Sequence, residues 1–199
     1  MVLPNQLTTL RIILTPIFFF LFISDDPLLK QIALIIYFIA AITDWYDGWL
    51  ARKFNYITNW GKFMDPLADK FLTSAAFIAF VILGFVPLWM VIIIIVRDFY
   101  VTGLRIYADI QNKAFTTSKL AKVKTFTQMI FVFYLLIVIT LKTIQPLAAN
   151  YNHLLNMLTD HYFVYYTMLI ITLFTFYTGI TYTRNNLTLI KELFSFETK

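Results

Sequence analysis

Long uninterrupted runs of apolar residues dominate the chain, and they do not alternate with polar residues as the strands of a closed barrel would. A helix needs roughly 20 apolar residues to cross the hydrocarbon core of a membrane. Six runs of about this length are separated by shorter polar segments. They cover residues 7–24, 31–51, 66–84, 87–109, 121–142 and 161–183. The pattern therefore predicts an all-α, polytopic membrane protein with six transmembrane helices, forming a single domain over residues 1–199.

The first apolar run predicts a retained helix rather than a cleaved signal peptide. Arg11 lies inside it, no small-residue cleavage site follows, and the next run begins almost at once. The composition agrees with a membrane class, because 60% of the 199 residues are hydrophobic and only 14% are charged. Soluble domains carry about 25% charged residues. The chain has no Cys, which excludes disulfides, a thiolate nucleophile and Cys-ligated metals.

Lysine and arginine are distributed unequally between the two ends of the predicted helices. If the chain crosses six times, 13 of its 16 basic residues fall on the side that also holds both termini. This positive side is predicted to face the cytoplasm, because cytoplasmic loops of membrane proteins are enriched in Lys and Arg. The net charge of +5 in so apolar a chain indicates contact with anionic lipid rather than with nucleic acid.

Four aspartates gather at the cytoplasmic ends of the second and third predicted helices. Asp44 and Asp47 are three residues apart, and Asp65 and Asp69 are four apart, so each pair shares one helix face. The connection over residues 52–64 is expected to return the chain and bring the two pairs together. Pro66 is expected in the first turn of the third helix, which would leave Asp65 near its N-cap.

This acidic cluster predicts a metal site. Any one of these aspartates alone would be read as a helix cap or as a solvated interfacial group, but four on facing helices would repel one another without cations between them. Lys or Arg could neutralise them, although oxygen-only ligands suit Mg²⁺ or Mn²⁺ better. Two such ions about 3.5–4 Å apart could clamp a phosphoryl group in line. Two of the five glycines, Gly48 and Gly61, bracket the cluster, which indicates a close approach to the backbone.

The spacing of these residues resembles the signature of the CDP-alcohol phosphotransferase family, D-x2-D-G-x2-A-R-x8-G-x3-D-x3-D. The stretch from Asp44 to Arg52, followed by Gly61, Asp65 and Asp69, matches every fixed position. The resemblance implies a homodimer of six-helix subunits that uses two divalent metals per subunit. It also implies transfer of a substituted phosphate from a CDP-alcohol to a hydroxyl, with release of CMP.

The same resemblance assigns roles to individual residues. It implies that Asp44, Asp47, Asp65 and Asp69 are metal ligands and that Asp69 also acts as the general base. It implies that Gly48, Ala51, Arg52 and Gly61 bind the CDP-lipid. The neighbouring Thr43 is added to this group as a further CDP-lipid-binding residue. The guanidinium of Arg52 could contact phosphate oxygens or hold an aspartate in place.

Further segments resemble one branch of the family. Residues 5–11 are similar to N-x-L-T-x-x-R and residues 61–70 to G-K-F-x-D-P-x-A-D-K, and the likeness extends over roughly residues 4–130. Asp98 and Ile106 depart from it, at positions where Glu is usual. This branch implies CDP-diacylglycerol as donor, sn-glycerol 3-phosphate as acceptor, phosphatidylglycerophosphate as product, and a bacterial-type cytoplasmic membrane as location.

An acceptor phosphate carries close to two negative charges and needs cationic partners. The candidates are Arg97, Arg105, Lys122 and Lys124. Arg97 lies within a predicted span, where an unpaired Arg is costly, so Asp98 is an equally good partner for it. Lys122 and Lys124 could instead belong to a solvated positive loop. Arg11 could pair with an aspartate of the cluster or contact phosphate.

Other functions fit parts of the sequence. The same chemistry could use phosphatidylglycerol, an inositol phosphate or serine as acceptor. A cation transporter would spread its acidic residues through the membrane depth, whereas these gather at one face. A catalytically silent homologue is disfavoured because no position of the signature is missing.

Overall fold

The computed structural model describes residues 3–54, 59–111, 113, 115 and 119–195. Within this part it gives the backbone alone for residues 3–5, 45, 47–52, 54, 59, 60, 62 and 193–195. All regular structure among the described residues is helical. The helices are α1 (Leu3–Ile23), α2 (Pro27–Phe54), α3 (Asn59–Ile82), α4 (Leu88–Ile110), α5 (Lys119–Leu141), α6 (Gln145–Asn150), α7 (Asn152–Leu158), α8 (His161–Asn185) and α9 (Leu187–Ser195).

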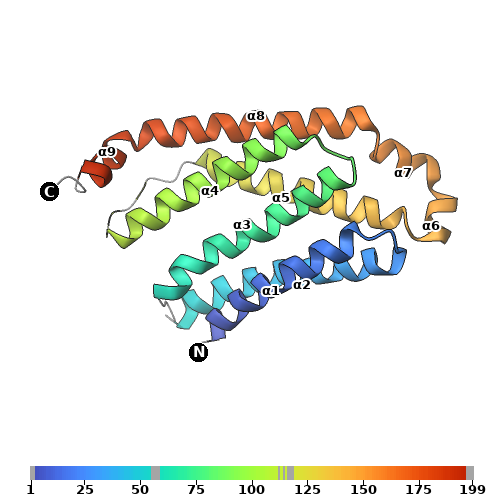
Figure 1. Cartoon of the computed structure of the whole chain (residues 1–199), viewed down its shortest axis with the longest axis horizontal. Helices are drawn as coiled ribbons and strands as arrows, with labels where there is room; N and C mark the ends of the chain where they lie inside the picture. The colour runs from blue at the N-terminus through green and yellow to red at the C-terminus, as the bar shows by residue number, and fades with distance from the viewer. Residues whose placement is uncertain (1–2, 55–58, 112, 114, 116–118, 196–199) are drawn as a thin grey trace.

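The six long helices run side by side in an elongated bundle (Figure 1). Helix α1 packs against α2 and α3, α3 packs against α4 and α5, and α8 packs against α4 and α5. One end of the bundle holds the start of α1, the start of α3, the end of α4 and the short helix α9 (Figure 1). The opposite end holds the α1–α2 turn together with α6 and α7. The long helices therefore alternate in direction as predicted.

Four described segments are long and apolar enough to cross a membrane. They are Gln6–Ile23, Pro27–Asp44, Lys119–Leu141 and Asn152–Asn185. Helices α3 and α4, with 24 and 23 residues, have comparable length but carry more ionisable side chains. The all-α membrane architecture is thus confirmed, whereas six crossings and the side that faces the cytoplasm stay predictions.

The boundary between α2 and α3 differs from the prediction. Helix α2 continues to Phe54 and α3 begins at Asn59, so the predicted connection over residues 52–64 is wrong. Pro66 lies inside α3 rather than in its first turn, and Asp65 is therefore not at an N-cap. A proline inside a membrane helix is tolerated when neighbouring groups satisfy the carbonyl that it leaves without a backbone donor. The acidic residues consequently lie on regular helix rather than at its start.

Short capped turns close the end of the bundle opposite the aspartates. The backbone N–H of Leu28 donates to Asp26 Oδ1 at 2.7 Å, and that of Phe163 donates to Asp160 Oδ1 at 3.0 Å. Each aspartate thereby satisfies an N–H that the first turn of α2 or α8 would leave unpaired. Gly84, with φ of 78°, provides the left-handed residue after α3.

The apolar core occupies the half of the bundle near these turns. Phe22 of α1 and Phe80 of α3 are fully buried, with ring centroids 6.1 Å apart, and Leu135 and Met168 extend the same core into α5 and α8. Buried charged side chains lie in the other half, where Arg11, Asp98 and Lys124 are each 5% exposed or less. A buried charge is costly unless it is paired, so this polar half is the part of the bundle where a functional site is expected.

Candidate active site

Helix α1 contacts both helices that carry the predicted acidic residues. Arg11 is fully buried, and its Nη1 lies 2.5 Å from Asp44 Oδ1 of α2. One turn earlier, the Thr8 hydroxyl donates a hydrogen bond to Asp65 Oδ1 of α3. Asp44 also interacts electrostatically with Asp65 and Asp69, which places these three carboxylates in one neighbourhood. The pairing of Arg11 with an aspartate, one of its two predicted alternatives, is therefore the one observed.

Each of the three described carboxylates has a specific partner. Lys70 Nζ donates to Asp69 Oδ2 at 2.8 Å. Arg11 forms an ion pair with Asp44, and the Thr8 hydroxyl donates to Asp65. Burial raises the pKa of the Asp65 carboxyl, and the Thr8 hydrogen bond and the charge of Arg11 oppose that rise. These contacts reduce the mutual repulsion of the acidic groups.

Several residues predicted to hold metal or CDP-lipid lie outside the described side chains. For Asp47, Gly48, Ala51 and Arg52 the structure gives the backbone of α2 only. Gly61 is buried in α3, and the Thr43 hydroxyl donates to the Ala40 carbonyl of its own helix at 2.9 Å. Among the described residues alone, no group of three or more acidic or histidine side chains is arranged to hold a metal ion. The oxygen-only donor set nevertheless fits the chemistry of a hard divalent cation.

A cleft of about 520 Å³ opens between α3, α4 and α5, next to the acidic cluster. Its volume is typical of small-molecule sites, which span about 300–1,000 Å³. Its basic and acidic lining residues are Asp69, Lys70, Arg97, Asp98, Arg105, Asp109 and Lys122. The cleft thus brings the predicted general base, Asp69, to the same space as three of the four predicted acceptor-phosphate cations.

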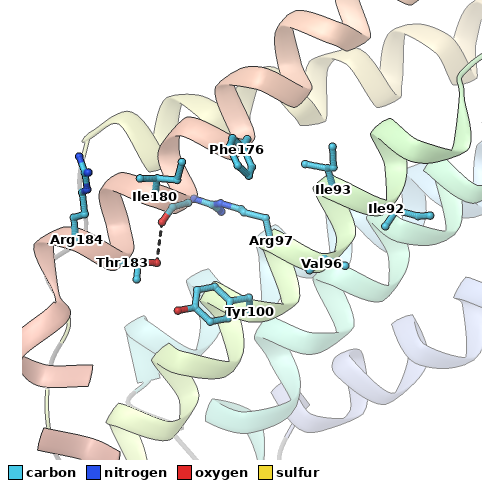
Figure 2. A pocket seen from close by; sticks show the side chains of 10 residues that line it. Ile92, Ile93, Val96, Arg97, Tyr100, Phe176, Ile180, Thr183 and Arg184 are labelled. Carbon is cyan, nitrogen blue, oxygen red and sulfur yellow. Dashed lines mark hydrogen bonds between the residues drawn. The ribbon is translucent and has the colours of Figure 1, made fainter. Parts of the chain in front are cut away.

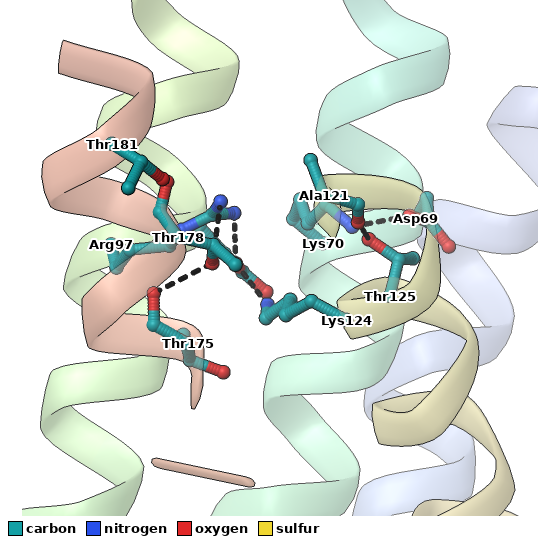
Figure 3. Close-up of polar contacts among 10 residues, drawn as sticks. Asp69, Lys70, Arg97, Ala121, Lys124, Thr125, Thr175, Thr178 and Thr181 are labelled. Carbon is teal, nitrogen blue, oxygen red and sulfur yellow. Dashed lines mark hydrogen bonds and ion pairs between the residues drawn. The ribbon is translucent and has the colours of Figure 1, made fainter. Parts of the chain in front are cut away.

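The fourth predicted cation, Lys124, lies in a buried ionic network behind the cleft. Its side chain is 1% exposed, and its Nζ donates a hydrogen bond to Asp98 Oδ1. Arg97 Nη1 lies 3.1 Å from the same carboxylate oxygen, so Asp98 neutralises two cations at once. Lys124 is not among the residues that line the cleft. Figure 3 shows Lys124 and Arg97 converging from α5 and α4, with Asp69 and Lys70 on the neighbouring helix.

Arg97 joins this network to helix α8. Its Nη2 donates to the Thr178 hydroxyl at 3.1 Å (Figure 3), and its Nη1 donates to Asp98 Oδ1 at 3.1 Å. Among the described residues Arg97 Nε is buried without a hydrogen-bond partner. A guanidinium carries five N–H donors, so the bonds to Asp98 and Thr178 leave further donors on Arg97, which also lines the cleft.

Sequence reasoning missed two partners of these charged groups. Thr8 lies within the quoted N-terminal stretch, but nothing in the sequence pairs it with Asp65, which is 57 residues away. Thr178 carries no signal at all, because it is one of several threonines in an otherwise apolar helix. The hydroxyls of its neighbours Thr172 and Thr181 bond back to carbonyls of α8 itself.

Comparison with known proteins places these features in a family. The chain is 44% identical over 147 residues to the CDP-diacylglycerol–glycerol-3-phosphate 3-phosphatidyltransferase of Bacillus subtilis, covering 68% of this chain and 76% of that protein. It is 38% identical over 127 residues to the protein of the same name from Rickettsia typhi, covering 64% and 71%. A probable phosphatidylglycerophosphate synthase of Mycobacterium tuberculosis is 37% identical over 131 residues, covering 64% and 62%.

The family model for CDP-alcohol phosphatidyltransferases matches residues 1–177, which include the acidic cluster and the whole lining of the cleft. The match confirms the resemblance on which the site was predicted, and together with the apolar helices it makes the chain an integral membrane protein. This chain belongs to the CDP-alcohol phosphatidyltransferase family.

Proposed function

We propose that this protein transfers the phosphatidyl group from CDP-diacylglycerol to sn-glycerol 3-phosphate, giving phosphatidylglycerophosphate and CMP. The observation that carries the proposal is the shared cleft, in which Asp69 lies together with Arg97, Arg105 and Lys122. The phosphate dianion of the acceptor needs several cationic donors. The acceptor hydroxyl that attacks the donor needs a carboxylate within reach to take its proton. The names of the relatives from B. subtilis and R. typhi support the same donor and acceptor.

In this reaction the cleft binds the acceptor phosphate and presents the acceptor hydroxyl to Asp69. Arg97, Arg105 and Lys122 hold the phosphate, and the Asp69 carboxylate accepts a hydrogen bond from the 1-hydroxyl. The hydroxyl oxygen forms a bond to the phosphorus that bears diacylglycerol, and the bond from that phosphorus to CMP breaks. The proton passes to Asp69, and CMP leaves with the electron pair. Lys70 Nζ, at 2.8 Å from Asp69 Oδ2, orients the carboxylate before the transfer.

The donor pyrophosphate is proposed to lie against the acidic cluster. Asp44, Asp47, Asp65 and Asp69 would hold two Mg²⁺ or Mn²⁺ ions, which supply charge neutralisation and a better leaving group when bound. Thr43, Gly48, Ala51, Arg52 and Gly61 would form the nucleotide side. Arg11 and Thr8 orient two of the carboxylates from α1, because each makes a contact to one of them.

The active-site end of the bundle is proposed to face the cytoplasm in a bacterial-type membrane. Basic side chains of the cleft and of α5 gather at this end, as the positive-inside rule requires. Both substrates fit this placement, because CDP-diacylglycerol keeps its acyl chains in the lipid while the acceptor arrives from the cytosol. A homodimer is proposed from the family resemblance alone, and no nucleic-acid partner is expected.

An acceptor panel tests the proposed function. The purified protein in nanodiscs that contain CDP-diacylglycerol is given sn-glycerol 3-phosphate, phosphatidylglycerol, inositol 1-phosphate or serine, and CMP release is measured with each. We expect turnover with sn-glycerol 3-phosphate and little with the others. Absence of turnover with sn-glycerol 3-phosphate, together with turnover on another acceptor, would replace the proposed acceptor while keeping the chemistry.

Arg105→Gln should raise the KM for sn-glycerol 3-phosphate about 10- to 100-fold, because one charge-assisted contact to phosphate is lost. Arg105 is an exposed lining residue of α4, so the substitution leaves no charge buried without a partner. Lys119→Gln is the matched control, since Lys119 is an exposed cation of α5 that does not line the cleft. Equal KM values in the two variants would argue against an acceptor-phosphate role for Arg105.

A further inference from the structure

We propose that Thr178 and Gly179 of α8, the α8 pair, position Arg97 for the acceptor phosphate. This inference rests on the proposed function and extends it to a helix that contributes no residue to the lining of the cleft. The two residues directly follow the stretch matched by the family model. They are positioning residues, because they contact Arg97 rather than the substrate.

Gly179 lets the stem of Arg97 lie directly against the backbone of α8. A Cβ added at Gly179 would lie 2.9 Å from Arg97 Cγ and 3.6 Å from Arg97 Nε. Carbon atoms do not approach this closely, and Cγ is near the root of the side chain, where it cannot move without displacing the guanidinium. Any side chain at position 179 would therefore shift the charged group.

Thr178 fixes the direction of the same guanidinium. Its hydroxyl donates to the Thr175 carbonyl at 2.9 Å, so its proton is already committed and its lone pairs can accept from Arg97 Nη2 at 3.1 Å. Asp98 accepts from Nη1 at 3.1 Å on the other branch of the fork. With the stem against Gly179 and two nitrogens bonded, the guanidinium has one preferred orientation.

An alternative location for Arg97 makes this positioning necessary. A second, largely apolar cavity of about 470 Å³ lies between α4 and α8, and Arg97 lines both this cavity and the cleft. Figure 2 shows Arg97 reaching from α4 toward α8 among Ile180, Phe176 and Tyr100. An Arg without the α8 pair would have space to turn away from the cleft, and the acceptor phosphate would lose a donor.

Gly179→Ala tests the inference, and we expect it to raise the KM for sn-glycerol 3-phosphate roughly tenfold or more. Displacement of a binding group by about 1 Å can cost up to 100-fold. The KM for CDP-diacylglycerol should stay within about twofold of wild type. Alanine is a better helix former than glycine, so a purely structural role predicts an unchanged or higher Tm and no selective change in the acceptor KM.

Thr178→Val provides a second variant that keeps the shape of the side chain and removes only the hydroxyl. We expect a smaller rise in the acceptor KM, about threefold to tenfold, and recovery in Thr178→Ser, which restores the acceptor oxygen. Thr181→Val is the matched control on α8, because the hydrogen bonds of the Thr181 hydroxyl within the described part of the chain go to carbonyls of its own helix. Gly103→Ala is the glycine control, since a Cβ there would meet nothing within 4 Å.

Binding of inorganic phosphate by calorimetry, in nanodiscs that contain CDP-diacylglycerol, separates this inference from the proposed function. Absence of transfer to sn-glycerol 3-phosphate by the wild-type protein would overturn the proposed function, whereas weaker phosphate binding by Gly179→Ala than by Gly103→Ala would still support the α8 pair. Equal phosphate affinity in these two variants, no phosphate binding by wild type, or an unchanged acceptor KM in Gly179→Ala would overturn the positioning role.

Discussion

Asp69→Asn should abolish transfer while leaving the fold intact. The substitution removes the carboxylate that is proposed to take the proton from the acceptor hydroxyl, and such a base contributes about 100- to 10,000-fold to the rate. Its proposed second role as a metal ligand adds to the loss. The amide oxygen of asparagine can still accept from Lys70 Nζ, so the local contact at 2.8 Å survives. CMP release gives the rate, and circular dichroism with thermal unfolding reports on the fold.

Asp25→Asn is the control for this substitution. Asp25 is exposed in the turn between α1 and α2, at the far end of the bundle, and its replacement should change the rate by no more than about twofold. A residual rate in Asp69→Asn above about one tenth of wild type would contradict the proton-accepting role. A normal KM for both substrates in the same variant would assign the loss to the chemical step rather than to binding.

The long helices could be predicted from the sequence because membrane thickness sets the length of an apolar run. The predicted span over residues 87–109 corresponds to α4 at Leu88–Ile110, and the span over 121–142 to α5 at Lys119–Leu141. The prediction failed where helical residues are polar, because hydropathy does not detect polar helix. Helix α2 extends beyond its apolar part to Phe54, and α3 begins before its apolar part, at Asn59. Polar residues beyond the lipid can still form helix. The short helices α6, α7 and α9 lie in segments too brief to give a hydropathy signal.

The candidate site was predictable in its residue types but not in its pairings. Fixed spacing identified the acidic cluster, and charge requirements identified Arg97, Arg105 and Lys122, which the cleft brings to Asp69. Contacts between distant segments leave no periodic trace in the sequence. Arg97 and Thr178 are 81 residues apart, and only the packing of α4 against α8 brings them together.

Two predicted alternatives for Arg97 turn out to be compatible with each other. The sequence offered Asp98 or the acceptor phosphate as its partner, and the structure has Arg97 bonded to Asp98 while it also lines the cleft. A planar fork of five donors can serve a carboxylate on one edge and a phosphate on another. The same reasoning separates Lys124 from the other cations. Its ammonium is buried against Asp98, and the direct phosphate contact predicted for it remains a prediction.

Chelation should remove transfer completely, and Mg²⁺ or Mn²⁺ should restore it. Asp44 lies in electrostatic range of Asp65 and Asp69, and Arg11 and Lys70 each pair with one of these three carboxylates. Divalent ions would supply positive charge to these carboxylates together with the charge that a pyrophosphate donor demands. The measurement is CMP release from protein treated with EDTA, then dialysed and titrated with each ion.

Manganese binding gives a readout that does not depend on turnover. Electron paramagnetic resonance should detect two Mn²⁺ ions per chain, and Asp44→Asn should lower that occupancy because it removes a proposed oxygen ligand. Asp25→Asn should leave the occupancy unchanged, since Asp25 lies at the opposite end of the bundle. Turnover that survives exhaustive chelation would assign neutralisation of the aspartates to basic side chains such as Arg11 and Lys70. Asp44 and Asp65 would then serve the packing of α1 against α2 and α3 rather than metal binding, and Asp44→Asn would lower the Tm more than the rate.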